Sequence, residues 1–248
     1  MSEDDYFRYT HSVLIVPMVA VLIIWTVFYI EVRFGVNFNQ YGVYPRTFEG
    51  LRGIFLSPFI HGSLQHLYNN TLPLAILLAS LLYFYRDISF KVLGYGLLLT
   101  GAFTWLVGRP SYHIGASGLI YLLASFIFFK GIFTRHYRLV ALSLIVVFIY
   151  GGLLWLIFPL LEGISWESHL GGFLSGLFLA ASLHTKVPPA PTYSWEADDY
   201  KEEEDEFLQQ FDEDGNFIGK GTPPEQDKDP LHIRYIYRKK KEEDEEGS

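Results

Sequence analysis

A serine between small residues stands at the head of a long apolar run, in the segment HIGASGLIYLL of residues 113–123. A serine hydroxyl in an apolar helix usually donates to a carbonyl one turn earlier, so Ser117 alone indicates no chemistry. It becomes a nucleophile only when a base removes its proton, and histidine is suited to that task near neutral pH. Ser117 is therefore a candidate nucleophile only if the fold brings a histidine to it.

Two other segments carry strongly polar side chains at the heads of apolar runs. In HGSLQHLYNN, residues 61–70, His66 and Asn70 are four apart and share one helical face. In SHLGGFLSG, residues 168–176, His169 is followed by Gly172 and Gly176, whose spacing lets another helix approach closely. Polar and ionisable side chains inside membrane spans are costly, so each of these is a candidate functional residue.

Six apolar segments approach the length of about 20 residues that a helix needs to cross a hydrocarbon core. The predicted spans are His11–Ile30, His66–Tyr85, Lys91–Val107, Ser117–Lys130, Tyr137–Phe158 and Ser168–His184. The second, fourth and sixth spans run in the same direction, which puts the polar heads of all three at one membrane depth. We therefore predict an all-α membrane protein with six transmembrane helices, in which Ser117 and His169 meet.

These side chains together favour acyl transfer. A helix that begins at Ser117 presents free backbone N–H groups and the positive end of its dipole to a developing oxyanion. His66 and the Asn70 amide add donors, an arrangement that contributes strongly to such reactions. Tyr121, one turn below Ser117, is expected to pack its ring against His169.

Three motifs, in this order along the chain, resemble those of the rhomboid family of intramembrane serine proteases. Gly-x-Ser-Gly matches residues 115–118, from Gly115 to Gly118. The pattern His-x4-His-x3-Asn matches His61, His66 and Asn70. The pattern Ala-His-x2-Gly-x3-Gly matches residues 168–176, with serine in place of alanine. The likeness covers about residues 10–184 and does not extend to the tail.

The resemblance implies a rhomboid-like bundle that hydrolyses peptide bonds in or near transmembrane helices of other proteins, without a metal or organic cofactor. It implies Ser117 as nucleophile and His169 as general base. The implied oxyanion stabilisers are His66, Asn70 and the Ser117 N–H. Supporting roles are implied for Tyr121 stacked on the base, for His61, Gly115, Gly118, Gly172 and Gly176, and for Arg52, whose partner tryptophan in the family is Leu51 here.

Three alternatives stay open. A catalytically silent rhomboid-like membrane protein, which binds or chaperones others, is expected to lose the nucleophile or the base, and this chain keeps both. A transporter would line a pathway with its polar residues but would not predict a glycine-flanked serine opposite a histidine. A metalloprotease could use several histidines, but the chain lacks His-Glu-x-x-His. We expect His113 to be exposed, and Glu162 and Glu167 to be solvated charges of the fifth loop.

The long first loop, residues 31–65, contains many aromatic residues, and we expect part of it to form short amphipathic helix in the interface plane. The acidic segment MSEDDYFRYT before the first span is unlike a cleaved signal peptide, so that span is expected to stay. The absence of cysteine excludes disulfides, thiol nucleophiles and thiolate metal sites.

Charge divides the chain in two. Residues 185–248 carry 9 basic and 19 acidic residues, a formal charge of −10, which leaves 10 basic and 8 acidic residues, or +2, in residues 1–184. The proline-rich start and charge blocks of residues 185–248 predict a linker and a largely disordered acidic tail of unknown partner. A small hairpin is expected around Asp214 and Gly215.

Basic residues near the span ends predict the orientation in the membrane. Seven lie on the side of the termini and four on the other: Arg8, Arg86, Lys91, Lys130, Arg135, Arg138 and Lys186 against Arg33, Arg46, Arg52 and Arg109. Both termini are therefore expected in the cytoplasm, with the site opening to the outer face of a bacterial inner membrane. The expected partners are the lipid bilayer and transmembrane protein substrates, and no nucleic acid.

Overall fold

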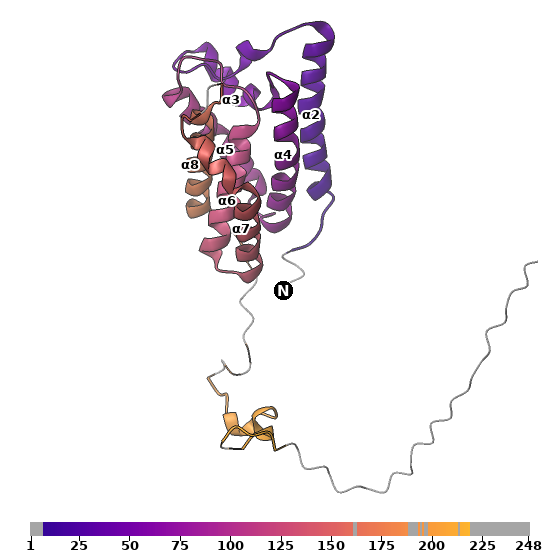
Figure 1. The fold of residues 1–248 in the computed structure, drawn as a ribbon, viewed down its shortest axis with the longest axis vertical. Helices are drawn as coiled ribbons and strands as arrows, with labels where there is room; N and C mark the ends of the chain where they lie inside the picture. The colour runs from indigo at the N-terminus through magenta and orange to yellow at the C-terminus, as the bar shows by residue number, and fades with distance from the viewer. Residues whose placement is uncertain are drawn as a thin grey trace, which may run out of the picture. The chain divides into compact units, whose positions relative to one another are not determined.

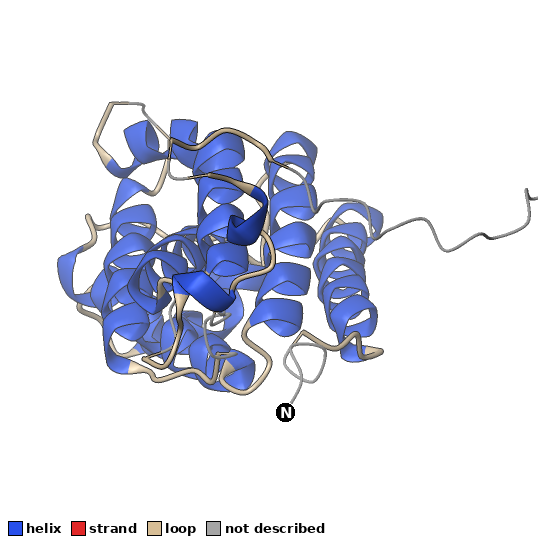
Figure 2. Cartoon of the chain, turned by 90° about the horizontal axis from the view of Figure 1, so that it is seen from below, coloured by secondary structure: helices blue, strands red, loops and turns tan. Residues whose placement is uncertain are grey.

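The computed structural model describes residues 7–160, 163–187, 193, 195, 198–212 and 214–218. The chain divides into two compact units, Met1–Ala190 and Pro191–Ser248. The described part of the first unit is helical, with its long helices standing side by side (Figures 1 and 2). Its helices are α2 (Ser12–Phe34), α3 (Gly53–Leu56), α4 (Leu64–Phe84), α5 (Ser89–Val107), α6 (Ser117–Thr134), α7 (Tyr137–Tyr150) and α8 (Trp166–Ser182).

Five of these helices are long and apolar enough to cross a membrane: α2, α4, α5, α6, and α7 together with its continuation to Ile157. The sixth predicted span corresponds to α8, which has 17 residues. At 1.5 Å per residue it is about 25 Å long, somewhat less than the roughly 30 Å of a hydrocarbon core. Five of the six predicted spans therefore have the character of membrane helices, and the sixth stays a prediction.

Local capping explains where several helices begin and end. Helix α4 starts at Leu64, before the predicted His66, because the Ser63 hydroxyl accepts the His66 N–H over 3.1 Å. Helix α2 continues past the predicted Ile30 to Phe34, and Gly35 ends it in the left-handed region with φ of +64°. Helices α5, α6 and α8 also start or end two to four residues from the predicted bounds.

The fifth span changes geometry part-way along. Helix α7 ends at Tyr150, and the chain continues as the 3-10 helix η4 (Gly151–Ile157). Two consecutive glycines, Gly151 and Gly152, stand at the change, and glycine weakens an α-helix by about 1 kcal/mol relative to alanine. The fifth span is therefore not the single continuous helix that its hydropathy suggests.

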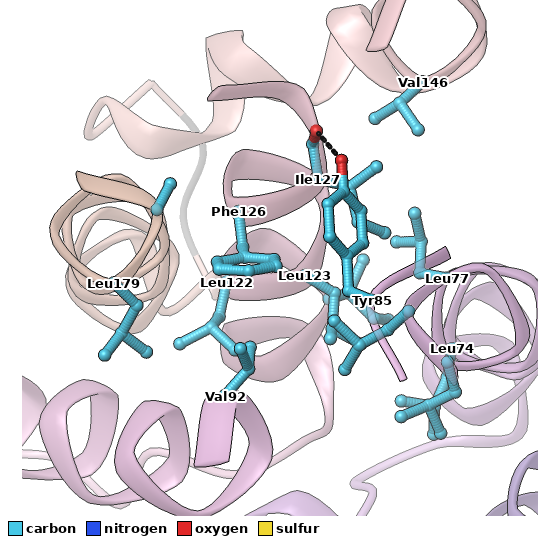
Figure 3. Packing of buried hydrophobic residues seen from close by; sticks show 14 of the residues in the cluster. Leu74, Leu77, Tyr85, Val92, Leu122, Leu123, Phe126, Ile127, Val146 and Leu179 are labelled. Carbon is cyan, nitrogen blue, oxygen red and sulfur yellow. Dashed lines mark hydrogen bonds between the residues drawn. The ribbon is translucent and has the colours of Figure 1, made fainter. Parts of the chain in front are cut away.

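Helix α6 lies at the centre of the first unit. In the most apolar stretch of α6, 56% of the residues are buried, whereas 17% are buried in the corresponding stretch of α2. Its fully buried side chains, Leu122, Leu123, Phe126 and Ile127, pack against residues of α4, α5, α7 and α8 (Figure 3). The Tyr85 hydroxyl, just after α4, donates to the Ile127 carbonyl over 3.4 Å. The helix that begins at Ser117 is thus the most firmly held in the unit.

The first loop contains the short helices η1 (Asn39–Tyr41), η2 (Glu49–Arg52), α3 and η3 (Ser57–Phe59). Their buried positions are glycines, whereas Phe48 and Phe55 are exposed. Val43 pairs in antiparallel fashion with His113, across the loop that precedes α6. The expected short helical segments are therefore present, and the first loop reaches the residues before Ser117.

The described part of the second unit has short stretches of local structure, and the largely disordered acidic tail stays a prediction. It contains the 3-10 helices η6 (Glu202–Glu204) and η7 (Leu208–Gln210) and an antiparallel bridge between Phe211 and Phe217. Gly215 lies at φ of +79° in the turn between the bridged residues, as expected for a hairpin there. The charge block of residues 238–248 lies outside the described residues.

Candidate active site

The turn before α6 is shaped by a glycine. Gly115 has φ of +105°, a region that residues with a side chain rarely adopt, and its N–H donates to the Ser57 carbonyl over 2.8 Å. A Cβ at this position would lie 2.5 Å from the His66 ring. The turn therefore brings the backbone before Ser117 directly against the second predicted motif.

His61 holds the next residue of the turn. Its Nε2 accepts the Ala116 N–H over 3.4 Å, and its ring meets the His66 ring edge-on at 5.0 Å. Burial, together with the neighbouring His66, lowers the pKa of His61 to about 4. His61 is consequently neutral near pH 7, which leaves Nε2 free to accept.

Glycines bring α8 against α6. A Cβ on Gly172 would clash with the Gly118 carbonyl oxygen, and one on Gly176 would clash with the Leu122 carbonyl oxygen. A Cβ on Gly118 would lie 2.5 Å from the Ser168 hydroxyl. The two helices therefore approach with backbone against backbone, as the glycine spacing predicts.

This approach brings His169 to Ser117. The His169 Nε2 lies 2.8 Å from the Ser117 Oγ, and its Nδ1 lies 3.0 Å from the Leu156 carbonyl oxygen of η4. A carbonyl oxygen only accepts, so Nδ1 carries the hydrogen and Nε2 is the acceptor for the Ser117 hydroxyl. Consecutive hydrogen bonds thus link Ser117, His169 and the Leu156 carbonyl that orients the base.

Tyr121 lies against the base. Its ring stacks on that of His169, with the centroids 4.2 Å apart and the planes at 10°. The Tyr121 hydroxyl donates to the Leu153 carbonyl over 2.7 Å. Helix η4 therefore accepts hydrogen bonds from both rings of this stack.

His66 and Asn70 line the same cavity as Ser117 and His169, a space of about 1100 Å³. The Asn70 Nδ2 is buried and has no hydrogen-bond partner within the described structure. A buried amide donor without a partner is uncommon and calls for an explanation. Its position in the cavity of Ser117 makes it a candidate donor to a bound ligand.

Arg52 is not part of this cluster. It lies at the end of η2 in the first loop, where its Nη2 donates to the Gln40 carbonyl over 3.1 Å. Its guanidinium also lies 4.6 Å from the Tyr41 ring centroid. Arg52 therefore ties η1 to η2 within the loop.

Two expectations about polar residues near the site were wrong. His113 is 3% exposed and Glu167 is 1% exposed, although both were expected in solvent. Burial lowers the pKa of His113. Their only signal in the sequence is their spacing, four residues before Ser117 and two before His169. Glu162 lies outside the described residues.

No group of three or more histidine, cysteine, aspartate or glutamate side chains is placed to hold a metal ion in the part of the chain that the structure describes. The rings of His61 and His66 contact each other, and His169 lies against Ser117.

Apolar helices of this length and number define the chain as a multi-pass integral membrane protein. The Rhomboid domain family model matches residues 49–186, which contain every residue of the cluster, and the chain belongs to the rhomboid family.

The chain is also similar to proteins described as uncharacterised in three mycobacteria. It is 33% identical over 171 residues to one from Mycobacterium tuberculosis and to one from Mycobacterium bovis, which covers 64% of this chain and 70% of each relative. It is 36% identical over 141 residues to one from Mycobacterium leprae, covering 52% of this chain and 55% of that protein. The descriptions of these relatives name no activity.

Proposed function

We propose that this chain is an intramembrane serine endopeptidase that hydrolyses peptide bonds in or near transmembrane helices of other proteins. The observation that supports it most directly is the 2.8 Å separation of the His169 Nε2 from the Ser117 Oγ. Membership of the rhomboid family supports the same function. A catalytically silent protein would not need a histidine whose unprotonated nitrogen faces a serine hydroxyl.

Acylation follows from this pair. The Ser117 Oγ attacks the scissile carbonyl carbon while its proton passes to the His169 Nε2. When the tetrahedral intermediate collapses, the bond to the amide nitrogen breaks and His169 returns the proton to the leaving amine. The products of this half-reaction are a free amine end and an ester on Ser117.

Deacylation repeats the sequence with water. His169 removes a proton from a water molecule, whose oxygen attacks the ester carbonyl, and the bond to the Ser117 Oγ then breaks. The proton returns to Ser117 and the acid product leaves. The cavity beside the dyad carries polar side chains, among them Gln65 and Asn69, which suits the entry of water.

The negative oxygen that develops in each half-reaction needs donors. The backbone N–H groups of the first turn of α6 have no partner within the helix and lie at the positive end of its dipole. The unpartnered Asn70 Nδ2 and the His66 ring in the same cavity supply side-chain donors. We assign Asn70 and His66 to oxyanion stabilisation.

The membrane arrangement is part of the proposal. Helix α8 serves as the sixth span, both termini lie in the cytoplasm of a bacterial cell, and the cavity opens to the outer face. Substrates are membrane proteins, because a site at the heads of α4, α6 and α8 lies close to the level where a transmembrane helix leaves the bilayer.

The test uses the purified full chain in proteoliposomes with a substrate of one transmembrane helix between two soluble domains. Wild type is expected to cleave it, and Ser117→Ala and His169→Ala are expected to abolish cleavage with unchanged circular dichroism. Ser80→Ala is the control, because that exposed hydroxyl donates to the Ile76 carbonyl of its own helix. Cleavage retained by either dyad variant would contradict the proposal.

A further inference from the structure

We propose that Arg109, His113, Ser165 and Glu167 form a clamp of positioning residues that holds the turn before Ser117 against the first turn of α8. This inference rests on the proposed function, because the two segments joined by the clamp carry the nucleophile and the base. None of the four residues belongs to the motifs that define the dyad or the oxyanion donors. We call these four residues the loop clamp.

On the side of the base, the loop clamp begins at Ser165, directly before α8. The Ser165 carbonyl accepts the backbone N–H groups of Ser168 and His169 over 3.1 and 3.2 Å. Its hydroxyl lies 2.5 Å from the His113 Nδ1. A displacement of Ser165 therefore displaces the backbone of the base itself.

On the side of the nucleophile, His113 joins three loops. Its backbone N–H and carbonyl pair with Val43 of the first loop over 2.9 and 3.0 Å. Its Nε2 lies 3.1 Å from the Arg109 carbonyl oxygen, so Nε2 carries the hydrogen and Nδ1 accepts from the Ser165 hydroxyl. Burial lowers the pKa of His113 and keeps this neutral tautomer near pH 7.

Glu167 makes the second connection. Its Oε1 accepts the Arg109 backbone N–H over 3.1 Å and lies 3.8 Å from the Arg109 Nε. The Arg109 Nη2 in turn donates to the Ile164 carbonyl over 2.5 Å. Glu167 Oε2 is buried without a hydrogen-bond partner in the described residues. A buried carboxyl oxygen without a partner is costly for folding, so Glu167 is a poor choice for stability alone and a candidate positioning residue.

The loop clamp restricts the helix movements that the glycine contact still allows. Gly118 and Gly172 set how closely α6 and α8 approach, but a helix can still shift along or rotate about its axis by a fraction of a turn. Two connections oppose such shifts: one joins His113, four residues before Ser117, to Ser165, and the other joins Arg109, eight residues before Ser117, to Glu167. A misplacement of about 1 Å at reacting groups can cost about 100-fold in rate.

The experiment measures inactivation of the full chain in detergent by a fluorophosphonate, with the adduct on Ser117 found by mass and with the maximal rate separated from reagent affinity. Glu167→Ala and Ser165→Ala are expected to lower the maximal rate by about 10- to 100-fold, with affinity for the reagent unchanged. Glu167→Gln and Ser165→Thr restore an acceptor and a hydroxyl, and they are expected within about fivefold of wild type.

Two matched controls make the same chemical changes elsewhere. Glu49→Ala removes an exposed carboxylate of the first loop, and Ser80→Ala removes an exposed hydroxyl of α4. Both are expected to react at the wild-type rate. Rates near wild type in Glu167→Ala and Ser165→Ala would overturn the inference, as would equal losses in the rescue variants.

A second measurement does not depend on reactivity. The chain has no cysteine, so spin labels at Ser111→Cys and Ile164→Cys report the distance between the two clamped loops. Glu167→Ala is expected to broaden this distance distribution, and an unchanged distribution would contradict the loop clamp. If wild type forms no adduct on Ser117, the proposed function fails, while the spin-label distances still test the loop clamp by themselves.

Discussion

The two segments that contact or carry the dyad histidine, η4 and α8, differ in how tightly they pack. Helix α8 meets α6 through Gly172 and Gly176, where added side chains would clash with backbone. None of the seven residues of η4 is buried, yet its Leu153 and Leu156 carbonyls accept the hydrogen bonds of Tyr121 and His169. The position of the base thus depends on a tight contact, and its orientation on a partly exposed segment.

This difference separates two requirements of a general base. Its distance to the nucleophile must be constant, and a contact without intervening side chains provides that. Its tautomer needs only one acceptor at Nδ1, which any backbone carbonyl supplies. The hydrogen bonds that η4 accepts come from backbone carbonyls and tolerate changes of side chain more readily than the glycine contact does.

The most damaging change should be a side chain in the tight contact. Gly172→Val places a branched side chain against the Gly118 carbonyl and is expected to abolish cleavage and lower stability by about 1–3 kcal/mol or more. Cleavage in proteoliposomes and unfolding of the detergent-solubilised protein measure the two effects.

The matched control lies in the exposed segment. A Cβ on Gly152 of η4 meets no atom within 4 Å, so Gly152→Ala is expected to leave cleavage near the wild-type rate. If both glycine variants behaved alike, the contrast between α8 and η4 would be wrong.

Asn70 of α4 extends the comparison of α8 with η4. Helix α4 is assigned to stabilising the negative oxygen of the reaction, and it does not place the base. Asn70→Ala is expected to lower the cleavage rate by about 10- to 1000-fold through loss of an oxyanion donor. The fall should appear in the rate at saturating substrate, with stability unchanged or raised because a buried unpartnered amide is removed. An unchanged rate would return Asn70 to a packing role.

Apolar runs were enough to predict the five helices that are long and apolar enough for a membrane, and three motifs named the residues that the fold brings together. The glycines of α8 could be predicted because close packing requires a particular residue type. The acceptor role of Leu156 could not be predicted, because every residue has a backbone carbonyl and the residue type does not show which one accepts. His113 and Glu167 were misjudged for a related reason: a polar residue in a loop is buried only when distant loops fold over it, which no local pattern reports.

Tyr121→Phe tests the contribution of η4 without disturbing the ring stack. The variant loses the hydrogen bond to the Leu153 carbonyl, worth about 1 kcal/mol, and is expected to lower the cleavage rate by about fivefold. A loss as large as that of His169→Ala would show that η4 does more than orient the base. Cleavage kinetics under the conditions used for wild type decide between these results.

The last prediction concerns the turn before α6 and appears only when the pH is lowered. The unfolded chain binds a proton at His61 below about pH 6.5, but the folded chain does so only near pH 4, so protonation favours unfolding between these values. The free energy of unfolding should therefore fall as the pH is lowered through this range. His61→Gln, which retains an acceptor for the Ala116 N–H, should lose this part of the pH dependence, and an identical profile would contradict the assignment.

The measurement that tests the central claim most directly is the intact mass of the detergent-purified protein after treatment with a fluorophosphonate. The account predicts a single adduct on Ser117 in wild type, unaffected by a metal chelator and absent from Ser117→Ala and His169→Ala. No adduct in wild type, with the helical fold shown to be intact, would contradict an activated serine and favour a catalytically silent member of the family.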